Sequence, residues 1–245
     1  MTQRKLKVGM AFRGTAYHGY QRQDNASSVQ ETVECALTKL LKEQVTIFGC
    51  SRTDAGVHAS SFCFHLVTAN RIPCEGFVRG LNTLLPGDIA IQSCEEAPED
   101  FHARFDAKGK EYIYKIWTGE RNPFLENLAL HHPFPVDVEL LQTAAESLVG
   151  EHDFAAFCGA SSTVKSTVRT IYGIQVRREG KMVEISVCGN GFLYNMVRIV
   201  AGTLLYVGEG KIAPGELPGI LASRDRTRAG ITAPPHGLYL NRVWY

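Results

Sequence analysis

The sequence predicts an α+β fold, because strand-like and helix-like segments are mixed without the strict strand–helix–strand alternation of a parallel sheet. Residues 6–12 alternate between apolar and small or basic side chains, which is the two-residue period of a half-buried strand. Residues 28–43 place apolar side chains three and four residues apart, as amphipathic helices do. With 44% hydrophobic and 21% charged residues over 245 positions, the chain has enough apolar side chains for a core, and the composition excludes a disordered protein.

The elements of the first half are bounded by local signals. Ser28 and Glu31 match the capping-box pattern at the start of the first helix. The turn sequence Leu85-Pro86-Gly87-Asp88 ends a second, shorter helix. The elements expected here are a strand over 6–12, a helix over 28–43, strands over 45–50 and around 62–66, and a helix over 74–85.

The second half carries the same mixture of elements. Gly150 follows an amphipathic segment and is expected to be its left-handed C-cap. Glu179-Gly180 lies between two apolar segments and predicts a hairpin turn. The elements expected here are a strand over 110–117, a helix over 138–149, a hairpin over 168–188, a helix over 192–207 and a short strand up to Tyr245.

The charges are balanced overall but are unevenly distributed. The formal net charge is +1, yet residues 1–25 hold five basic residues and one acid, and residues 161–181 hold five basic residues and one acid. Segregated charge of this kind can build a basic cleft for nucleic acid, although most charged segments are simply solvated surface. We expect two lobes, an N-terminal α/β lobe over 1–106 and a C-terminal α/β lobe over 107–245.

Several classes of protein are disfavoured. The seven cysteines are scattered and form no C-x-x-C pair, so neither a zinc site nor a disulfide framework is expected. We expect reduced, mostly buried thiols instead. No apolar run of about 18 residues predicts a membrane span, and the N-terminus resembles no secretory signal, so we expect a cytoplasmic protein.

Common catalytic motifs are absent as well. The sequence contains no H-E-x-x-H, G-x-S-x-G or G-x-x-x-x-G-K-[ST] pattern. Gly189-Asn190-Gly191 lies between a predicted strand and helix, as a dinucleotide loop would, but Tyr194 occupies the position of the third glycine. A nicotinamide-dependent oxidoreductase is therefore disfavoured.

The most unusual segment is the loop G-C-S-R-T-D-A-G-V-H at residues 49–58. It places Arg52 and Asp54 among small residues, between two apolar strands. Loops held by a rigid sheet often carry catalytic groups. The alternative is an ordinary turn in which aspartate and glycine supply the backbone shape.

This loop closely resembles the active-site loop of the tRNA pseudouridine synthase A (TruA) family. The resemblance extends over nearly the whole chain, in ordered blocks at matching spacing. The further blocks are Gly14-Thr15, Tyr20–Gln23, Ser28–Glu31, Asn82–Asp88, Asp100–Phe105, Gly150–Phe154, Phe192–Arg198, Gly202–Leu204 and Gly237–Leu240.

The resemblance implies a pseudouridine synthase fold, with two lobes of mixed and antiparallel sheet and flanking helices around a central RNA-binding cleft. It implies isomerisation of uridine to pseudouridine at positions 38, 39 and 40 of the tRNA anticodon stem-loop, without a cofactor or metal. Family members act as homodimers. A non-catalytic tRNA-binding or folding-assisting protein on the same scaffold is the alternative.

The resemblance also assigns roles to four residues. Asp54 would be the catalytic nucleophile and Arg198 its charge partner, whereas a solvated helix charge is the alternative for Arg198. Tyr112 would stack on the target base, and the alternative is that Tyr112, Tyr114 and Ile116 form a plain core face. Arg52 would either enter the space left by the flipped nucleotide or hold a phosphate.

Overall fold

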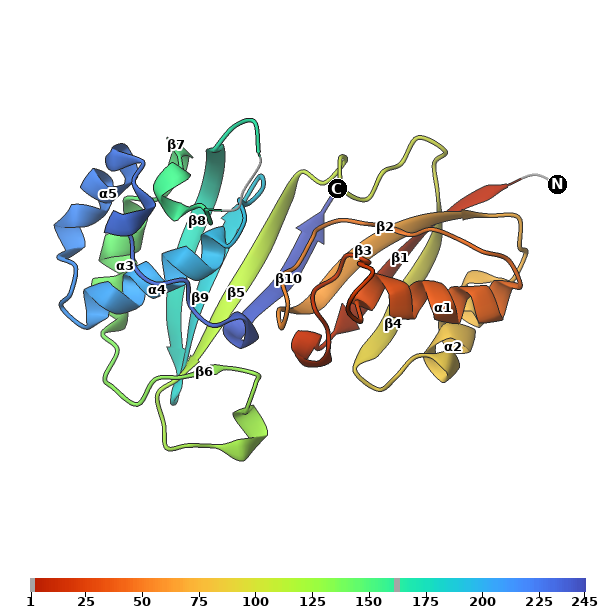
Figure 1. Ribbon diagram of the computed structural model, residues 1–245, viewed down its shortest axis with the longest axis horizontal. Coiled ribbons are helices and arrows are strands. Elements are labelled where there is room, and N and C mark those ends of the chain that lie inside the picture. The colour runs from red at the N-terminus through yellow and green to blue at the C-terminus, as the bar shows by residue number, and fades with distance from the viewer. Residues whose placement is uncertain (1–2, 161–163) are drawn as a thin grey trace. The chain divides into compact units, whose positions relative to one another are not determined.

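The computed structural model describes residues 3–160 and 164–245 and divides the chain into two compact units (Figure 1). Unit 1 comprises Met1–Lys108 and Leu240–Tyr245, and unit 2 comprises Gly109–Tyr239. Both units combine antiparallel strands with helices, so the predicted α+β class is confirmed.

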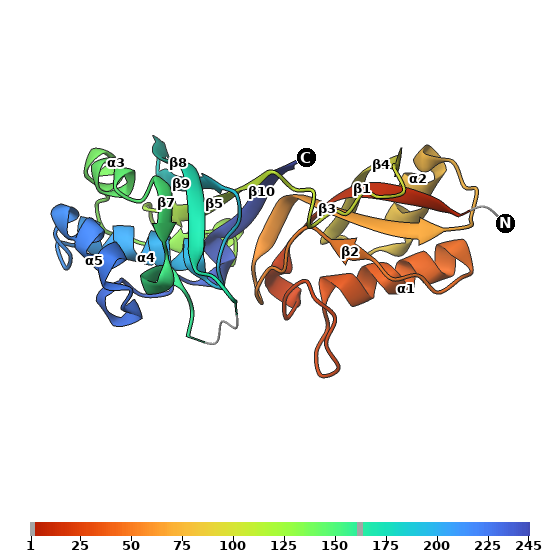
Figure 2. The ribbon, with the colours of Figure 1, turned by 90° about the horizontal axis from the view of Figure 1, so that it is seen from above.

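Unit 1 is built on a small antiparallel sheet. Strand β1 lies in its middle and pairs with β3 on one side and β4 on the other, and β2 adds to β3. Helix α1 lies alongside these strands (Figure 2), and α2 packs against both α1 and β4. The elements are β1 (Arg4–Phe12), a 3-10 turn (Gly14–Ala16), α1 (Val29–Leu41), β2 (Phe48–Gly49), β3 (His58–Thr68), α2 (Cys74–Leu84) and β4 (Ile89–Ala97).

The first strand and helix follow the periodicity of their sequences. Leu6, Val8 and Met10 are fully buried and alternate with half-exposed residues along β1. Ser28 caps α1, because its side-chain oxygen accepts a hydrogen bond from the Glu31 main-chain N–H at 3.2 Å. The predicted strand and the cap by Ser28 are confirmed; of the predicted capping box, the hydrogen bond from the Glu31 N–H to Ser28 is observed.

Two segments of unit 1 differ from expectation. The strand predicted over 45–50 is reduced to Phe48–Gly49. Conversely, the acidic segment after the second helix contains strand β4, for which no strand was predicted. Only Ile89 and Ile91 are buried in β4, so its apolar period is too short to recognise from sequence.

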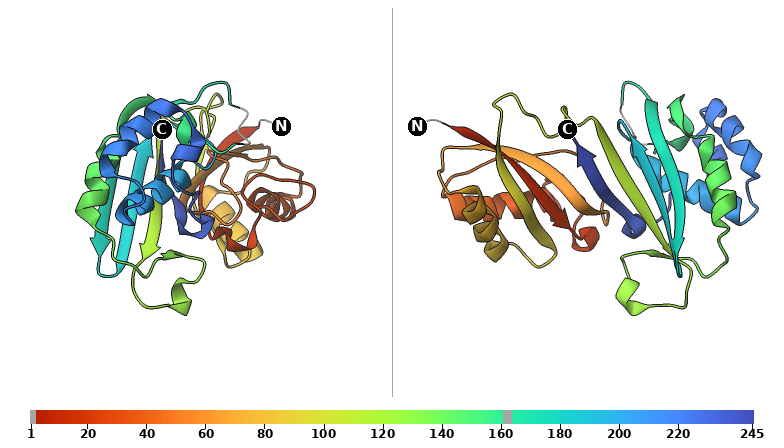
Figure 3. Two further views of the ribbon diagram at one scale, coloured as in Figure 1. Left: turned by 60° about the vertical axis from the view of Figure 1, so that its left-hand side comes forward. Right: turned by 180° about the vertical axis from the view of Figure 1, so that it is seen from behind.

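Within unit 2, antiparallel strands pair in the order β5-β9-β8-β7, and β6 pairs in parallel with β5. Helices α3, α4 and α5 lie on one side of β8 and β9 (Figure 3, right). The strands are β5 (Gly109–Trp117), β6 (Leu130–His131), β7 (Gly150–Asp153), β8 (Val168–Glu179) and β9 (Met182–Gly189). The helices are α3 (Val138–Glu146), α4 (Met196–Gly208) and α5 (Leu217–Ser223), with 3-10 turns at Pro123–Leu125, Ala155–Phe157, Pro214–Glu216, Arg226–Arg228 and Pro235–Gly237.

Two predicted helix ends in unit 2 are wrong. Helix α3 ends at Glu146, and Gly150, with φ 110°, begins strand β7 instead of capping the helix. Helix α4 begins at Met196 instead of 192, because Asn195 adopts the left-handed conformation with φ 60° and interrupts the helical path. The predicted hairpin is confirmed, since β8 and β9 are joined at Gly180 with φ 56°.

The last strand, β10 (Leu238–Trp244), contributes to both units. Tyr239 belongs to unit 2, where its hydroxyl donates to the Leu128 carbonyl at 2.6 Å. Tyr245 follows the strand in unit 1, where its hydroxyl donates to the Ala103 carbonyl at 2.8 Å. None of the seven cysteines forms a disulfide, but only Cys50, Cys63 and Cys158 are buried, so the expectation of mostly buried thiols is wrong. In the described part of the chain no helix has the length and apolarity to cross a membrane.

Candidate active site

The loop that carries Asp54 connects β2 to β3 in unit 1. It ends in a tight turn, in which the Val57 N–H donates to the Asp54 carbonyl at 3.1 Å and Gly56 has φ 77°. Asp54 is half-buried and Arg52 is exposed. The carboxylate is therefore carried on a short turn with a defined backbone shape.

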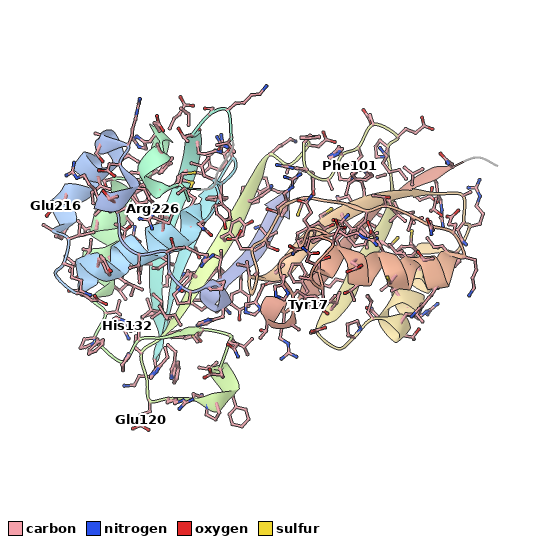
Figure 4. The ribbon with its side chains drawn as sticks, in the orientation of Figure 1. Tyr17, Phe101, Glu120, His132, Glu216 and Arg226 are labelled. Atoms are coloured by element: carbon pink, nitrogen blue, oxygen red, sulfur yellow. The ribbon has the colours of Figure 1, made fainter. Side chains whose placement is uncertain are left out.

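A second segment, residues 14–20, holds this loop in place through main-chain contacts. The Tyr20 N–H donates to the Thr53 carbonyl at 3.1 Å, and the Gly56 N–H donates to the Tyr17 carbonyl at 3.2 Å. Tyr17, labelled in Figure 4, is itself anchored because its hydroxyl donates to Asp88 Oδ1 at 2.9 Å. Residues 14–20 therefore form main-chain hydrogen bonds with the loop on both sides of Asp54.

Two glycines permit this close approach. A Cβ on Gly14 would lie 2.0 Å from the Val57 carbonyl oxygen, and a Cβ on Gly19, which has φ 98°, would lie 2.7 Å from the Thr53 carbonyl oxygen. Both neighbours are main-chain atoms, so no side-chain rotation could relieve the overlap. Gly14 lies in a block of the family resemblance and Gly19 lies beside one, but no sequence pattern indicated that their backbones contact the loop.

His58 ends the loop as a structural residue. Its ring is fully buried, and Nδ1 accepts a hydrogen bond from the Gly14 N–H at 2.9 Å. An accepting Nδ1 requires that the proton of the neutral ring be on Nε2. This bond ties the start of β3 to the segment that grips the loop.

Tyr112 lies in unit 2, on β5 opposite Val187 of β9. It is 7% exposed, and its ring contacts Phe192 edge-to-face with centroids 5.2 Å apart. Tyr114 is fully buried, donates from its hydroxyl to the Pro234 carbonyl at 2.8 Å, and has its pKa raised by burial. The core interpretation is therefore confirmed for Tyr114.

Arg198 lies on α4, and its guanidinium is held by defined partners. Nε donates to the Ala233 carbonyl at 2.7 Å, and Nη1 donates to Asn195 Oδ1 at 2.8 Å. The residue is half-buried. Together with burial, its positive charge lowers the pKa of His236. The alternative of a freely solvated helix charge is therefore wrong.

The carbonyl that holds Arg198 is placed by a segment that runs along α4. A Cβ on Gly202 would lie 2.0 Å from the Ile231 carbonyl oxygen, and the Gly230 N–H donates to Thr203 Oγ1 at 2.9 Å. The Ala233 N–H also donates to the Arg198 carbonyl at 3.1 Å. A glycine inside a helix costs about 1 kcal/mol of stability relative to alanine. Gly202 within α4 was therefore a signal in the sequence that another segment packs closely against this helix.

The four residues singled out from sequence are therefore divided between the units. Unit 1 brings Arg52 and Asp54 together on one loop, and unit 2 carries Tyr112 and Arg198. Among residues 3–160 and 164–245, no group of three or more His, Cys, Asp and Glu side chains is arranged to hold a metal ion.

Comparison with known proteins agrees with the loop motif. A family model described as tRNA pseudouridine synthase matches residues 10–106 and 144–245. A tRNA pseudouridine synthase A of Ruminiclostridium cellulolyticum is 50% identical over 244 residues, covering 99% of this chain and 100% of the relative. A protein of the same name from Acetivibrio thermocellus is 46% identical over 243 residues, covering 99% of this chain and 100% of the relative.

Solved structures are more distant. A chain in the crystal structure of a Cbf5-Nop10-Gar1 complex aligns with 96% of this chain and 48% of its own length, at 16% identity and a TM-score of 0.38. That score is too low to support any conclusion about this chain. The matched family model and the full-length relatives are sufficient, and the chain belongs to the tRNA pseudouridine synthase family.

Proposed function

We propose that this chain isomerises uridine to pseudouridine at positions 38, 39 and 40 of the tRNA anticodon stem-loop, with Asp54 as the nucleophile. The observation that carries the proposal is the G-C-S-R-T-D-A-G-V-H loop, which presents one half-buried carboxylate on a turn gripped by residues 14–20. The relatives named tRNA pseudouridine synthase A, which match over their full length, support the reaction and the substrate class.

The reaction is consistent with a single carboxylate. The bond from C1′ to N1 of the uracil breaks, the base turns, C5 bonds to C1′, and the proton at C5 is lost while N1 gains one. No atom is added from outside, so a second carboxylate to activate water, as in inverting glycosidases, is not required. An aspartate can act covalently or can stabilise the charge that develops as the base leaves.

The other three residues receive roles from the family resemblance. Arg198 is the charge partner that stabilises the ionised form of Asp54. Its attachment to Asn195 and the Ala233 carbonyl supports this role, because a fixed guanidinium needs no reorganisation when charge develops. Tyr112 provides a flat aromatic wall for the flipped uracil, and its phenol can move a proton.

The resemblance supports two further proposals about the working enzyme. One is that it acts as a homodimer in which a single tRNA contacts both subunits. The other is that it works in the cytoplasm. Light scattering during size-exclusion chromatography tests the first, with twice the 27.0 kDa chain mass as the expected result.

Release of tritium from C5 of labelled uridines in unmodified tRNA tests the proposed function directly. Isomerisation frees the C5 hydrogen, whereas binding alone cannot. We expect release that is proportional to enzyme and confined to the three anticodon positions. Tight tRNA binding without tritium release would instead identify the non-catalytic tRNA-binding alternative.

A further inference from the structure

A cavity of about 400 Å³ opens beside the Asp54 loop, entirely within unit 1. This lies within the range of about 300–1,000 Å³ that is typical of small-molecule sites. The residues that could recognise a ligand come from three separated stretches of sequence. They are Gln21, Phe48, Arg52, His102, Arg104 and Phe105.

Two arginines line this cavity without a partner of opposite charge. Arg52 and Arg104 lie close enough that the charge of Arg52, in addition to burial, lowers the pKa of Arg104. Neither guanidinium forms a hydrogen bond or ion pair with any other residue that the structure describes. Adjacent guanidiniums repel each other, and a phosphate that bridges them replaces this repulsion with charge-assisted hydrogen bonds.

The nearby carboxylates are already engaged elsewhere. Asp106 accepts a hydrogen bond from the His102 main-chain N–H at 2.7 Å. Glu34, which is 7% exposed, is held by Arg22 at 3.3 Å and by the main-chain N–H of Ile47 at 3.1 Å. The positive charge of the cavity is therefore available to an external anion.

Two further polar groups line the cavity. His102 Nδ1 accepts from the main-chain N–H of Arg104 at 3.1 Å, so the neutral ring carries its proton on Nε2 and can donate there. Tyr20 is 3% exposed, and its hydroxyl lacks a hydrogen-bond partner in the described chain. Buried polar groups normally have partners, so an unpaired hydroxyl here is consistent with a ligand or water.

Aromatic rings form the other wall. Phe105 is 75% exposed and Phe48 is 48% exposed, so both rings present apolar surface to solvent. The rings form a continuous series, with centroid distances of 5.1 Å from Phe48 to His65, 4.7 Å from His65 to His102 and 4.3 Å from His102 to Phe105. An exposed ring face of this kind can stack on a nucleobase.

The part of the cavity wall formed by residues 102–105 is held against strand β3 of unit 1. His65, on β3, accepts at Nδ1 from the Ala103 main-chain N–H at 3.1 Å. Phe101, labelled in Figure 4, contacts the His65 ring edge-on at 6.0 Å. The segment that carries Arg104 and Phe105 is therefore fixed in place before any ligand binds.

We infer that this cavity binds a second nucleotide of the substrate RNA, one that adjoins the reacting uridine. Arg52 and Arg104 hold its phosphate, and Phe105 stacks on its base. Arg52 precedes Asp54 by two residues, so their Cα atoms are at most about 7 Å apart, and a strand that places its uridine at Asp54 passes the cavity. The inference rests on the proposed function, and it assigns Arg52 to phosphate binding instead of base displacement.

Binding of an unmodified anticodon stem-loop RNA over a range of salt concentrations tests the phosphate contact. We expect Arg104→Ala to raise Kd about tenfold and to reduce the slope of log K against log salt by about 0.7–0.9, the loss of one phosphate contact. Arg79→Ala removes an exposed arginine of unit 1 that does not line the cavity, and should leave Kd within twofold. Wild-type affinity and slope in Arg104→Ala would overturn the inference.

Phe105 provides an independent test of the base contact. Phe105→Leu keeps the apolar volume but loses the flat ring, and should raise Kd about five- to tenfold without changing the salt slope. Phe105→Tyr keeps the ring and should bind as the wild type does. Equal binding by Phe105→Leu and Phe105→Tyr would exclude stacking.

Two controls separate the possible failures. Thermal melts establish that each variant is folded, and Arg104→Gln, which keeps most of the side-chain length, replaces Arg104→Ala if that variant is not. Tritium release by the wild-type chain is measured in parallel. Absence of release together with weakened binding by the cavity variants would refute the proposed function and keep the nucleotide site.

Discussion

The Asp54 loop of unit 1 and the Arg198 helix of unit 2 hold their functional side chains in different ways. The loop is gripped by main-chain hydrogen bonds from residues 14–20, and glycines allow the two backbones to touch. Arg198 projects from a regular helix, and its guanidinium is held directly by Asn195 and the Ala233 carbonyl. In unit 1 the hydrogen bonds position the main chain of the Asp54 loop, whereas in unit 2 they position the Arg198 guanidinium itself.

This difference separates the effects that substitutions should have. A change in Asp54 removes its charge, whereas the hydrogen bonds that residues 14–20 form with the loop are made by main-chain atoms and do not depend on that side chain. A change around Arg198 alters both its geometry and the packing of α4, where nearly every residue is buried.

The largest effect is expected from Asp54→Asn. Asparagine keeps the shape of the side chain and the main-chain grip but removes the negative charge. We expect tRNA affinity to be retained and tritium release to fall by about 10⁴-fold or more, as for loss of a catalytic nucleophile. Turnover near the wild-type rate would refute the mechanism.

Tyr112→Phe tests which unit supplies the group that moves the proton. The ring remains, so affinity should change little, while turnover should fall by about 10²–10⁴-fold if the hydroxyl transfers a proton. His58→Ala is the comparison, since the His58 ring is fully buried and its Nδ1 is occupied by the Gly14 N–H. Single-turnover rates on one tRNA decide between them, and a fast Tyr112→Phe with an inactive His58→Ala would transfer the role to the histidine.

Gly14→Ala and Gly202→Ala test the two supporting contacts. Each new Cβ would lie 2.0 Å from a carbonyl oxygen, of Val57 or of Ile231, so each should lower the free energy of unfolding by about 1–3 kcal/mol. Gly173→Ala is the control, because its Cβ would have no atom within 4 Å. Urea unfolding measures all three, and a control as unstable as the other two would show that steric overlap is not the cause.

Arg198→Met tests the proposed pairing with Asp54. On the proposed pairing, this change removes the positive charge that stabilises the Asp54 carboxylate, which should cost about 1–3 kcal/mol of folding stability and lower turnover. The double variant Asp54→Ala with Arg198→Met should regain stability but not activity. Thermal melts in which the double variant is no more stable than Arg198→Met would contradict the pairing.

The smallest expected effect is a pH dependence from His65. Burial, with the nearby charges of His102 and Lys5, lowers the pKa of His65 from 6.5 to about 4. Between these values the unfolded chain binds a proton that the folded chain does not, so stability should fall as pH falls from 6.5 towards 4. Urea midpoints at pH 7, 5.5 and 4.5 should show a smaller loss in His65→Gln, and equal losses would exclude His65 as a cause.

Strong periodicity made most elements predictable. The alternation in β1 and the spacing in α1 each place one face in a core, so burial and sequence pattern agree. Strand β4 was not predicted because most of its side chains are exposed to solvent, so they need not alternate between apolar and polar residues. Its residues Glu95 and Glu96 instead pair with Lys7 and Arg4 of β1 at 2.8 and 2.7 Å.

The groups that support the site were less visible than the site residues. Asp54 and Arg52 stand out because an acid and a base among small residues are conspicuous between apolar strands. The position of the Arg198 guanidinium depends on two partners. One is Asn195, the left-handed residue just before α4, and the other is the carbonyl of Ala233. A main-chain carbonyl is present in every residue, so no sequence pattern could have identified that partner.

The sequence by itself determined the α+β class, most strands and helices, the loop that carries Asp54 and the family to which the chain belongs. These depend on local periodicity and on an ordered set of motifs, both of which are written in neighbouring residues. Only the tertiary structure decided that residues 14–20 hold the loop, that residues 230–233 hold Arg198, and that Arg104 and Phe105 line the same cavity as Arg52. These contacts join residues far apart in the chain, and their energies depend on distances that exist only after the sheets have formed.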